Sequence, residues 1–279
     1  MAQPTTHSLK SADGTHIHAL RWQPQGEPRG ELLVIHGLGE HAARYQETAS
    51  DLVAAGWAVT AGDLRGHGKS GGKRGAIRHW ADYVADAKAV ASLIPSGRFV
   101  LLGHSMGGMV ALNFLSVHGG SVSGLVLSSP ALRVGVKAPA WKTGAASFLS
   151  KLWPDLRMGN ELDSDQITAD REVVAAYLAD PLVFHTVTPR WFTELLLVQE
   201  KQFEMARQST VPLWLFHGAD EAFVDISSFR TLVDAWPSIH HSSLTCWPNR
   251  RHECLNDTGR ADVISVLISQ LEAFSSQSA

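Results

Sequence analysis

The chain has 279 residues, 24 of them Lys or Arg and 27 Asp or Glu, with a formal net charge of -3 and 44% hydrophobic residues. This length permits one large globular domain or two smaller ones, and the balanced charge argues against a nucleic-acid partner, which needs a basic surface. Two cysteines, Cys246 and Cys254, are too few for a disulfide framework and predict reduced thiols. Because Met1–Lys10 lacks a secretory pattern and no segment approaches the roughly 20 apolar residues of a membrane span, we expect a cytoplasmic protein.

The first predicted element is a hairpin over Ser8–Trp22, because Asp13-Gly14 suits a tight turn that needs positive φ. Short apolar runs then recur along the chain, most of them apolar on both faces as strands of a covered parallel sheet are. These strand candidates are Glu31–His36, Trp57–Gly62, Arg98–Gly103, Gly124–Ser129, Pro212–His217 and Ser243–Trp247.

Apolar residues at helical spacing fill the stretches between the predicted strands. Three helix faces are formed by Tyr45, Ala49, Leu52 and Val53, by Trp80, Tyr83, Val84, Ala87, Val90 and Ala91, and by Val263, Ile264, Leu267, Ile268 and Leu271. Alternation of strands and helices with short connections predicts an α/β fold with a mostly parallel, doubly wound sheet.

Residues 133–209 interrupt this alternation, because they contain no strand candidate and their apolar residues fall at helical spacing. We expect a helical cap here, inserted between a first core segment, residues 1–132, and a second, residues 210–279. Apolar helix faces usually pack on a core, yet the cap has enough aromatic surface to wall an apolar pocket. The candidate pocket residues are Trp141, Phe148, Trp153, Trp191 and Phe192.

A buried strand candidate runs directly into Gly103-His104-Ser105-Met106-Gly107. The pattern G-x-S-x-G is typical of a nucleophile elbow, a turn so tight that side chains at its two glycines would collide with neighbouring backbone. The helix that follows would direct its N-terminal N–H groups at a developing oxyanion. The sequence therefore predicts Ser105 as a nucleophile, and the alternative is a glycine-rich helix start.

A nucleophilic serine needs a base to accept its proton and a carboxylate to orient that base, in the chain order Ser, Asp or Glu, His. The late strand candidate Pro212–His217 is followed by Gly218-Ala219-Asp220, so we predict Asp220 as the acid. Asp225 is the alternative acid. Either aspartate could instead cap the helix that follows.

The base is expected after the last strand, where Leu244–Pro248 leads to His252. His240 and His241 precede that strand and would lie at the opposite edge of the sheet, so we predict His252 as the base. The second oxyanion donor should come from the loop after an early strand. That loop is His36-Gly37-Leu38-Gly39, and we predict the N–H groups of Leu38 and Met106 as the oxyanion hole.

Two other patterns point to different chemistry but fail on spacing. The segment Gly62–Ser70 ends in Gly-Lys-Ser, yet a phosphate-binding loop needs its first glycine where Asp63 stands. Asp63, Arg65 and His67 are expected to brace a surface turn instead. The 14 histidines are scattered without a zinc-binding pattern, so we predict no metal and no other cofactor.

Several motifs resemble the monoacylglycerol lipase and lysophospholipase group of α/β-hydrolases, and the likeness spans nearly the whole chain. They are His36-Gly37-Leu38-Gly39-Glu40-His41 with Arg44-Tyr45, Gly103–Gly108, Asp63–Ser70, and Tyr177 with Asp180–Val183. The resemblance implies the α/β-hydrolase fold, the same nucleophile, acid, base and oxyanion donors, and no cofactor. The chain departs from the group mainly in residues 133–170.

We therefore expect a serine hydrolase of single-chain lipid esters, first of monoacylglycerol, with glycerol and a fatty acid as products. The first alternatives are a lysophospholipase or a short- to medium-chain carboxylesterase. Further alternatives are a thioesterase, a peptidase, or a non-catalytic binding protein on the same fold. A peptidase would need an acidic side chain to bind the substrate amine, for which the candidates are Glu40, Glu161 and Asp163. The expected partner is the lipid substrate, with transient membrane or micelle contact through the cap. The sequence indicates no oligomeric state.

Overall fold

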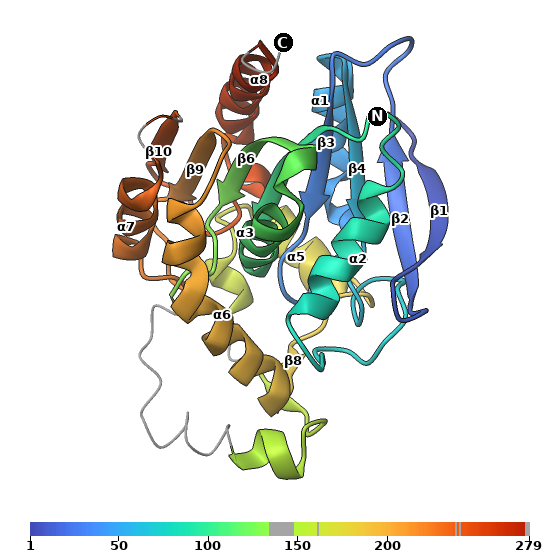
Figure 1. Cartoon of the computed structure of the whole chain (residues 1–279), viewed down its shortest axis with the longest axis vertical. Coiled ribbons are helices and arrows are strands. Elements are labelled where there is room, and N and C mark those ends of the chain that lie inside the picture. Colours follow the sequence, from blue (N-terminus) through green and yellow to red (C-terminus); the bar gives the residue numbers. More distant parts are fainter. Residues whose placement is uncertain (134–147, 161, 238, 240, 277–279) are drawn as a thin grey trace.

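An eight-stranded sheet forms the centre of the computed structural model, which describes residues 1–133, 148–160, 162–237, 239 and 241–276 (Figure 1). The strands follow the order β1-β2-β4-β3-β5-β6-β9-β10, with β2 antiparallel to β1 and β4 and all other pairs parallel. Their bounds are β1 Thr5–Lys10, β2 His16–Trp22, β3 Gly30–Ile35, β4 Trp57–Gly62, β5 Phe99–His104, β6 Val122–Ser128, β9 Leu213–Gly218 and β10 Ser242–Trp247. The predicted hairpin and the mostly parallel sheet are confirmed.

The central strands form where the sequence is mostly apolar. Every residue of β4, β5 and β9 is buried, as strands covered on both faces must be. Each predicted strand is present, with ends that differ by at most two residues. The edge strand β10 is only partly buried, because helices cover it less completely.

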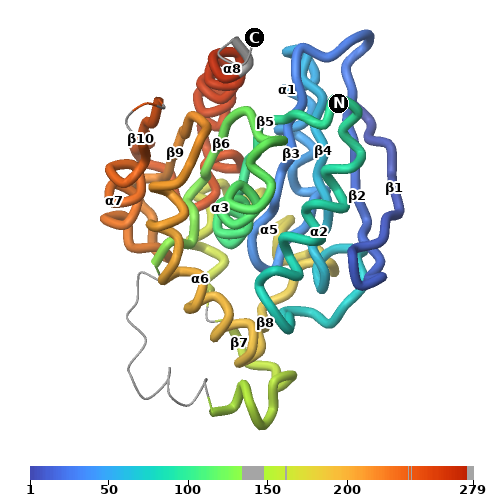
Figure 2. Tube along the Cα trace, viewed as in Figure 1, coloured from blue at the N-terminus to red at the C-terminus, as the bar shows by residue number. Residues whose placement is uncertain are grey.

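Helices cover both faces of the sheet, and each face has its own apolar core beneath the helices (Figure 2). One face is covered by α2 (Ala81–Ala91), α3 (Met106–His118), α6 (Pro189–Arg207) and α7 (Ser227–Ala235), and the other by α1 (Gln46–Ala54) and α8 (Arg260–Ser276). The three helices expected from their apolar faces are thereby confirmed as α1, α2 and α8.

The chain between residues 148 and 188 lies beyond the carboxyl ends of the parallel strands (Figures 1 and 2). It contains helical residues 148–152, the helix α5 (Arg171–Ala179), and two short antiparallel strands, β7 (Met158–Gly159) and β8 (Thr186–Val187). The expectation of no strand here is wrong, because two-residue strands are too short to show an alternating pattern. The division at residues 133 and 209 stays a prediction, since α6 also packs on the main core.

Candidate active site

The turn from β5 into α3 holds Ser105 in a conformation that L-residues seldom adopt. Its φ is 52° and its ψ is -119°, and its N–H donates to Ser128 O at 2.9 Å. A Cβ on Gly107 would lie 2.2 Å from Ile35 O, and one on Gly103 would lie 2.5 Å from Gly107 O. Since a strained backbone of this kind costs about 1–3 kcal/mol and persists only where its surroundings impose it, this turn has the form expected for a nucleophile.

The loop after β3 packs directly against the nucleophile turn. A Cβ on Gly37 would lie only 3.3 Å from Ser105 Cβ, and Leu38 lines the same pocket as Ser105. Met106 is the first residue of α3, where backbone N–H groups have no carbonyl partner within the helix. The chain crosses the sheet in one direction from β3 to β4 and in the opposite direction from β4 to β5, so the order of the strands reverses between β3 and β5. α/β folds bind their ligands at such a reversal. That Leu38 and Met106 donate to an oxyanion stays a prediction.

The imidazole of His252 faces a carboxylate that the sequence reasoning did not select. His252 Nδ1 lies 2.7 Å from Glu221 Oε2, and the Glu221 side chain is fully buried. Glu221 Oε1 accepts a hydrogen bond from Phe223 N at 2.9 Å, which fixes the carboxylate plane. His252 and Ser105 line one pocket, so the structure brings together Ser105, His252 and Glu221.

Asp220, the predicted acid, is not the carboxylate beside His252. Its backbone N–H donates to Arg250 O at 3.0 Å, and its side chain is exposed to solvent. Ala219 and Asp220 form the turn that follows β9, and the backbone bond to Arg250 holds this turn with Asp220 outside and Glu221 inside. Asp225, the alternative, accepts hydrogen bonds from the N–H and hydroxyl of Ser227 at the start of α7, which is the capping role.

The histidines before β10 lie away from this pair. The exposed His241 immediately precedes β10, at the opposite end of that strand from His252, as expected. His240 lies outside the described residues.

The electrostatics of the pair favour a charged Glu221 and a basic His252. Burial opposes ionisation of Glu221, but the charge and hydrogen bond of His252 outweigh it and lower the pKa of this carboxyl. Burial also opposes protonation of His252, but Glu221, joined by the charges of Glu253 and Glu40, raises the pKa of the imidazole above its usual 6.5. An ionised Glu221 accepts a hydrogen bond from Nδ1–H, which keeps the proton on Nδ1 and leaves Nε2 as the basic nitrogen.

Ser105 and His252 face a small pocket of about 50 Å³. Its lining is Gly37, Leu38, Glu40, His104, Ser105, Leu162, Ile167, Tyr177, Phe223, His252 and Glu253. The Phe223 ring packs edge-on against His252, with 5.1 Å between ring centroids. Among the cap residues that the structure describes, those that line the pocket are Leu162, Ile167 and Tyr177.

The five aromatic residues expected to wall the pocket lie elsewhere or outside the described residues. Trp191 is buried in the main core, where its Nε1 donates to Tyr83 OH at 3.1 Å, and Phe192 packs against the same core. Phe148 and Trp153 are 63% and 62% exposed. Trp141 lies outside the described residues. Trp191 does not line the pocket, because an apolar helix face packs first against the largest nearby core.

The turn that superficially resembles a phosphate-binding loop is a structural brace. Asp63 accepts hydrogen bonds from Ala42 N and Lys69 N, and it contacts His18 Nδ1 at 3.0 Å. Arg65 pairs with Asp86 at 2.7 Å. The turn is buried rather than at the surface, and burial lowers the pKa of His67 to about 3. Among the residues the structure describes, no group of three His, Cys, Asp or Glu could hold a metal ion.

Comparison with known proteins shows the family of the chain. The family described as "Serine aminopeptidase, S33" matches residues 26–259, which include Ser105, Glu221 and His252. The chain belongs to this family. The family and the parallel sheet together identify it as an α/β-hydrolase enzyme, a hydrolase of carboxylic esters, which confirms the predicted fold and enzyme class.

Similar members of the family carry lipase names. The chain is 34% identical to a monoacylglycerol lipase of Mycolicibacterium smegmatis, over 95% of this chain and 97% of the relative. It is 33% identical to the human monoglyceride lipase, over 81% of this chain and 76% of that protein. The solved monoacylglycerol lipase of Paleococcus ferrophilus superposes with a TM-score of 0.84 at 25% identity, over 92% of this chain and 99% of that one.

Proposed function

We propose that the chain hydrolyses monoacylglycerols to glycerol and a fatty acid through a covalent acyl-serine. The observation that carries the chemistry is that Ser105 and His252 line one pocket while Glu221 Oε2 lies 2.7 Å from His252 Nδ1. The lipase names of full-length relatives support the substrate class.

In the first half of the reaction Ser105 Oγ attacks the ester carbonyl carbon and His252 Nε2 accepts the hydroxyl proton. The carbonyl oxygen becomes an oxyanion, to which the N–H groups of Leu38 and Met106 would donate. Glu221 stabilises the imidazolium. The tetrahedral intermediate then breaks its bond to the alcohol oxygen, which receives the proton from His252 and leaves as glycerol.

In the second half a water molecule replaces the alcohol. His252 accepts a proton from the water as its oxygen attacks the acyl carbon, and a second tetrahedral intermediate forms. Its collapse breaks the bond to Ser105 Oγ, which regains a proton from His252. The fatty acid is released and the enzyme returns to its starting state without a cofactor.

The charges that line the pocket favour a neutral head group over a phosphate. Glu40 and Glu253 are buried carboxylates of the lining and Arg44 pairs with both, so these three side chains hold more negative than positive charge. A phosphate would be repelled there, whereas hydroxyl groups could donate to carboxylate oxygens. This supports monoacylglycerol ahead of lysophospholipid.

The acidic residues that could bind a substrate amine give less support to an aminopeptidase activity. Glu40 is already bonded to Gly37 N, Arg44 and Tyr45 OH. Asp163 caps a short helix by accepting from Asp165 N. Glu161 lies outside the described residues. A substrate ammonium would therefore compete with Arg44 for Glu40.

A substrate panel tests the proposal. Rates of release from 1-monooleoylglycerol, lyso-oleoylphosphatidylcholine and p-nitrophenyl acetate are compared at equal enzyme concentration. We expect the largest kcat/KM for the monoacylglycerol. A clear preference for p-nitrophenyl acetate, or for the lysophospholipid, would contradict this substrate assignment.

The cap surface supports transient contact with a lipid surface. Four apolar side chains within residues 148–156 are at least 45% exposed: Phe148, Leu152, Trp153 and Leu156. Exposed apolar clusters of this kind mark interaction sites. Leu152→Ser with Trp153→Ser should reduce co-flotation with phosphatidylcholine vesicles that contain monoolein. The control Val117→Ser alters an equally exposed side chain at the far end of α3, and equal flotation of both variants would contradict the contact.

We also propose that the protein is cytoplasmic. The free thiols of Cys246 and Cys254 fit a reducing compartment. No helix in the described part of the chain is both long and apolar enough to cross a membrane.

A further inference from the structure

A buried cluster of charge joins the two loops that flank the nucleophile. Arg44 Nη1 lies 2.8 Å from Glu40 Oε2 and 2.7 Å from Glu253 Oε1, and Arg44 Nη2 lies 2.7 Å from Glu253 Oε2. The side chains of all three residues are at most 10% exposed. The guanidinium also lies over the ring of Tyr177, 4.7 Å from its centroid. One cation therefore bridges two carboxylates and the cap.

Glu40 ties this cluster to the loop expected to form the oxyanion hole. Its Oε1 accepts a hydrogen bond from Gly37 N at 2.6 Å and another from Tyr45 OH at 3.1 Å. Gly37 immediately precedes Leu38, the expected oxyanion donor. Burial raises the pKa of Glu40, but the charge of Arg44 and smaller effects that include the hydrogen bond from Gly37 N lower it to about 2, so the carboxylate stays charged. The orientation of the loop thus depends on an ionised Glu40.

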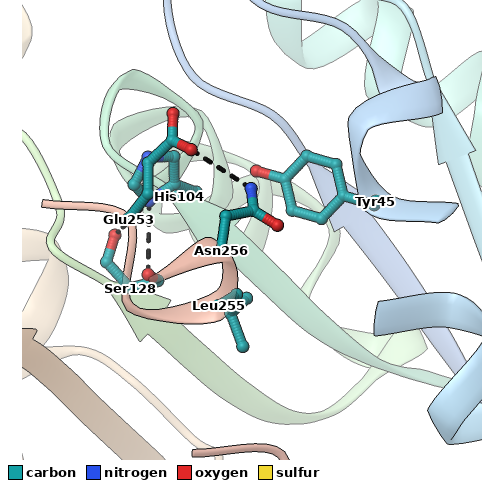
Figure 3. Close-up of a pocket in the computed structure, with 6 residues that line it drawn as sticks. All are labelled: Tyr45, His104, Ser128, Glu253, Leu255 and Asn256. Carbon is teal, nitrogen blue, oxygen red and sulfur yellow. Dashed lines mark hydrogen bonds between the residues drawn. The ribbon is translucent and has the colours of Figure 1, made fainter. Parts of the chain in front are cut away.

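Glu253 ties the same cluster to the loop that presents the base. It follows His252 in the chain, and its N–H donates to Ile167 O of the cap at 2.8 Å. Its Oε2 also accepts from Asn256 Nδ2 at 3.1 Å, a contact that Figure 3 shows beside Tyr45 and His104. The carboxylate is therefore held on two sides, by Arg44 and by Asn256.

Stability alone gives a poor reason for this arrangement. Buried ions lose their hydration, and apolar side chains of similar volume often stabilise such a site as well or better. The cluster also holds two carboxylates against one guanidinium. What it provides that an apolar cluster would not is a directional link between two loops distant in sequence.

We propose that Arg44, through Glu40 and Glu253, is a positioning residue that holds the loop of Leu38 and the loop of His252 in catalytic register around Ser105. Arg44 itself does not touch the reacting atoms. This role rests on the proposed serine chemistry and not on a lipid substrate. Glu253 and Glu40 have a second effect, because their charges favour the imidazolium that His252 becomes in the transition state.

The electrostatic effect on His252 can be measured through the pH dependence of kcat/KM, because the charged groups around its imidazole set the imidazole pKa. Glu221, Glu253 and Glu40 each raise the pKa of His252, while burial lowers it. The ring of His104 lies 4.8 Å from that of His252, and its pKa is lowered by burial and by His252, so it adds no positive charge near neutral pH. Removing the charge of Glu253 should therefore move the acid limb of kcat/KM to lower pH. A role only in packing would leave that limb in place.

The test uses Glu253→Gln and Glu40→Gln, which keep side-chain size, with p-nitrophenyl acetate as substrate. This ester has no glycerol head group, so lost head-group contact cannot explain a change in its rate. We expect kcat to fall about 10- to 100-fold with KM within about twofold, as for a misplaced catalytic group. Since both carboxylates act through Arg44, the double variant should lose less than the product of the two single losses.

The matched control is Glu272→Gln, which alters an exposed carboxylate of α8 that pairs with Arg29 and does not line the pocket. It should retain the wild-type rate and pH profile. If Glu253→Gln fails to fold, Glu40→Gln alone is judged by the same criteria.

Three results would overturn the positioning role. The first is a kcat for both variants within twofold of wild type with an unmoved acid limb. The second is a loss confined to monoacylglycerol, which would make the carboxylates head-group contacts. The third is a wild-type chain that neither cleaves p-nitrophenyl acetate nor reacts with a fluorophosphonate, which would refute the proposed serine chemistry and this role with it.

Discussion

Glu221 Oε2 accepts a hydrogen bond from His252 Nδ1 at 2.7 Å, and the neighbouring Asp220 points to solvent. Of these two adjacent acidic residues, Glu221 is therefore the candidate acid of the site and Asp220 is a surface residue. The separation is caused by backbone geometry: Asp220 N donates to Arg250 O, at the start of the loop that presents His252. This gives a direct comparison of two variants.

Glu221→Gln should lower kcat about 10³- to 10⁴-fold, because an amide in place of the carboxylate neither fixes the imidazole tautomer nor stabilises its charge. Asp220→Asn removes the same charge one residue away and should keep kcat within about twofold. Steady-state hydrolysis of p-nitrophenyl acetate by both variants measures this. The assignment of Glu221 fails if Asp220→Asn is the damaging change.

The pH dependence of kcat/KM should show an acid limb centred above pH 6.5. The pKa of His252 is raised by Glu221, and only the neutral imidazole can accept the serine proton, so activity is lost as the pH falls through that pKa. Glu221→Gln removes the main cause of the shift and should move the limb to lower pH. The measurement is a set of rates across pH 5–9 for both proteins, and an acid limb unchanged by the substitution would refute the electrostatic account.

Gly107→Ala should abolish activity and destabilise the fold. The added methyl group would lie 2.2 Å from Ile35 O and 2.4 Å from His36 O, so the elbow or β3 would have to move. A control is Gly120→Ala, where a Cβ meets nothing within 4 Å. Thermal unfolding and fluorophosphonate labelling of both variants measure the effect. A Gly107→Ala protein with normal stability and labelling would contradict the described packing.

Trp191→Phe should reduce stability by about 1–3 kcal/mol, because it leaves Tyr83 OH without the indole donor and opens a small cavity in the main core. Trp153→Phe, at an exposed position, should leave stability unchanged within about 0.5 kcal/mol. Denaturant unfolding of the two variants measures the difference. Equal stability would mean that Trp191 is not part of the core.

Much of the fold could be predicted because local sequence and tertiary structure agree there. The runs over β4, β5 and β9 are mostly apolar and buried at every position, and such runs have few alternatives to a buried strand. The positions of Ser105 and His252 follow from the same logic, because the ends of adjacent parallel strands meet at one edge.

The remaining errors lie where tertiary contacts decide. Proximity to the strand end could not distinguish Asp220 from Glu221, since the choice depends on a backbone bond to a loop 30 residues later. The segment Gly218-Ala219-Asp220-Glu221 did contain the signal, as a second carboxylate one step further along. Trp191 was expected at the pocket because aromatic composition does not say which way a helix face turns. Arg44 and Glu253 were missed as a pair because 209 residues separate them.

We propose that Ser105 carries the acyl group of a monoacylglycerol. The most direct measurement is oleate release from 1-monooleoylglycerol by the wild type and by Ser105→Ala, with intact mass spectrometry of both proteins after exposure to a fluorophosphonate. We predict oleate release and addition of one inhibitor group to the wild type, and neither for a folded Ser105→Ala. Oleate release by Ser105→Ala at near the wild-type rate, or inhibitor addition at another residue, would contradict the account.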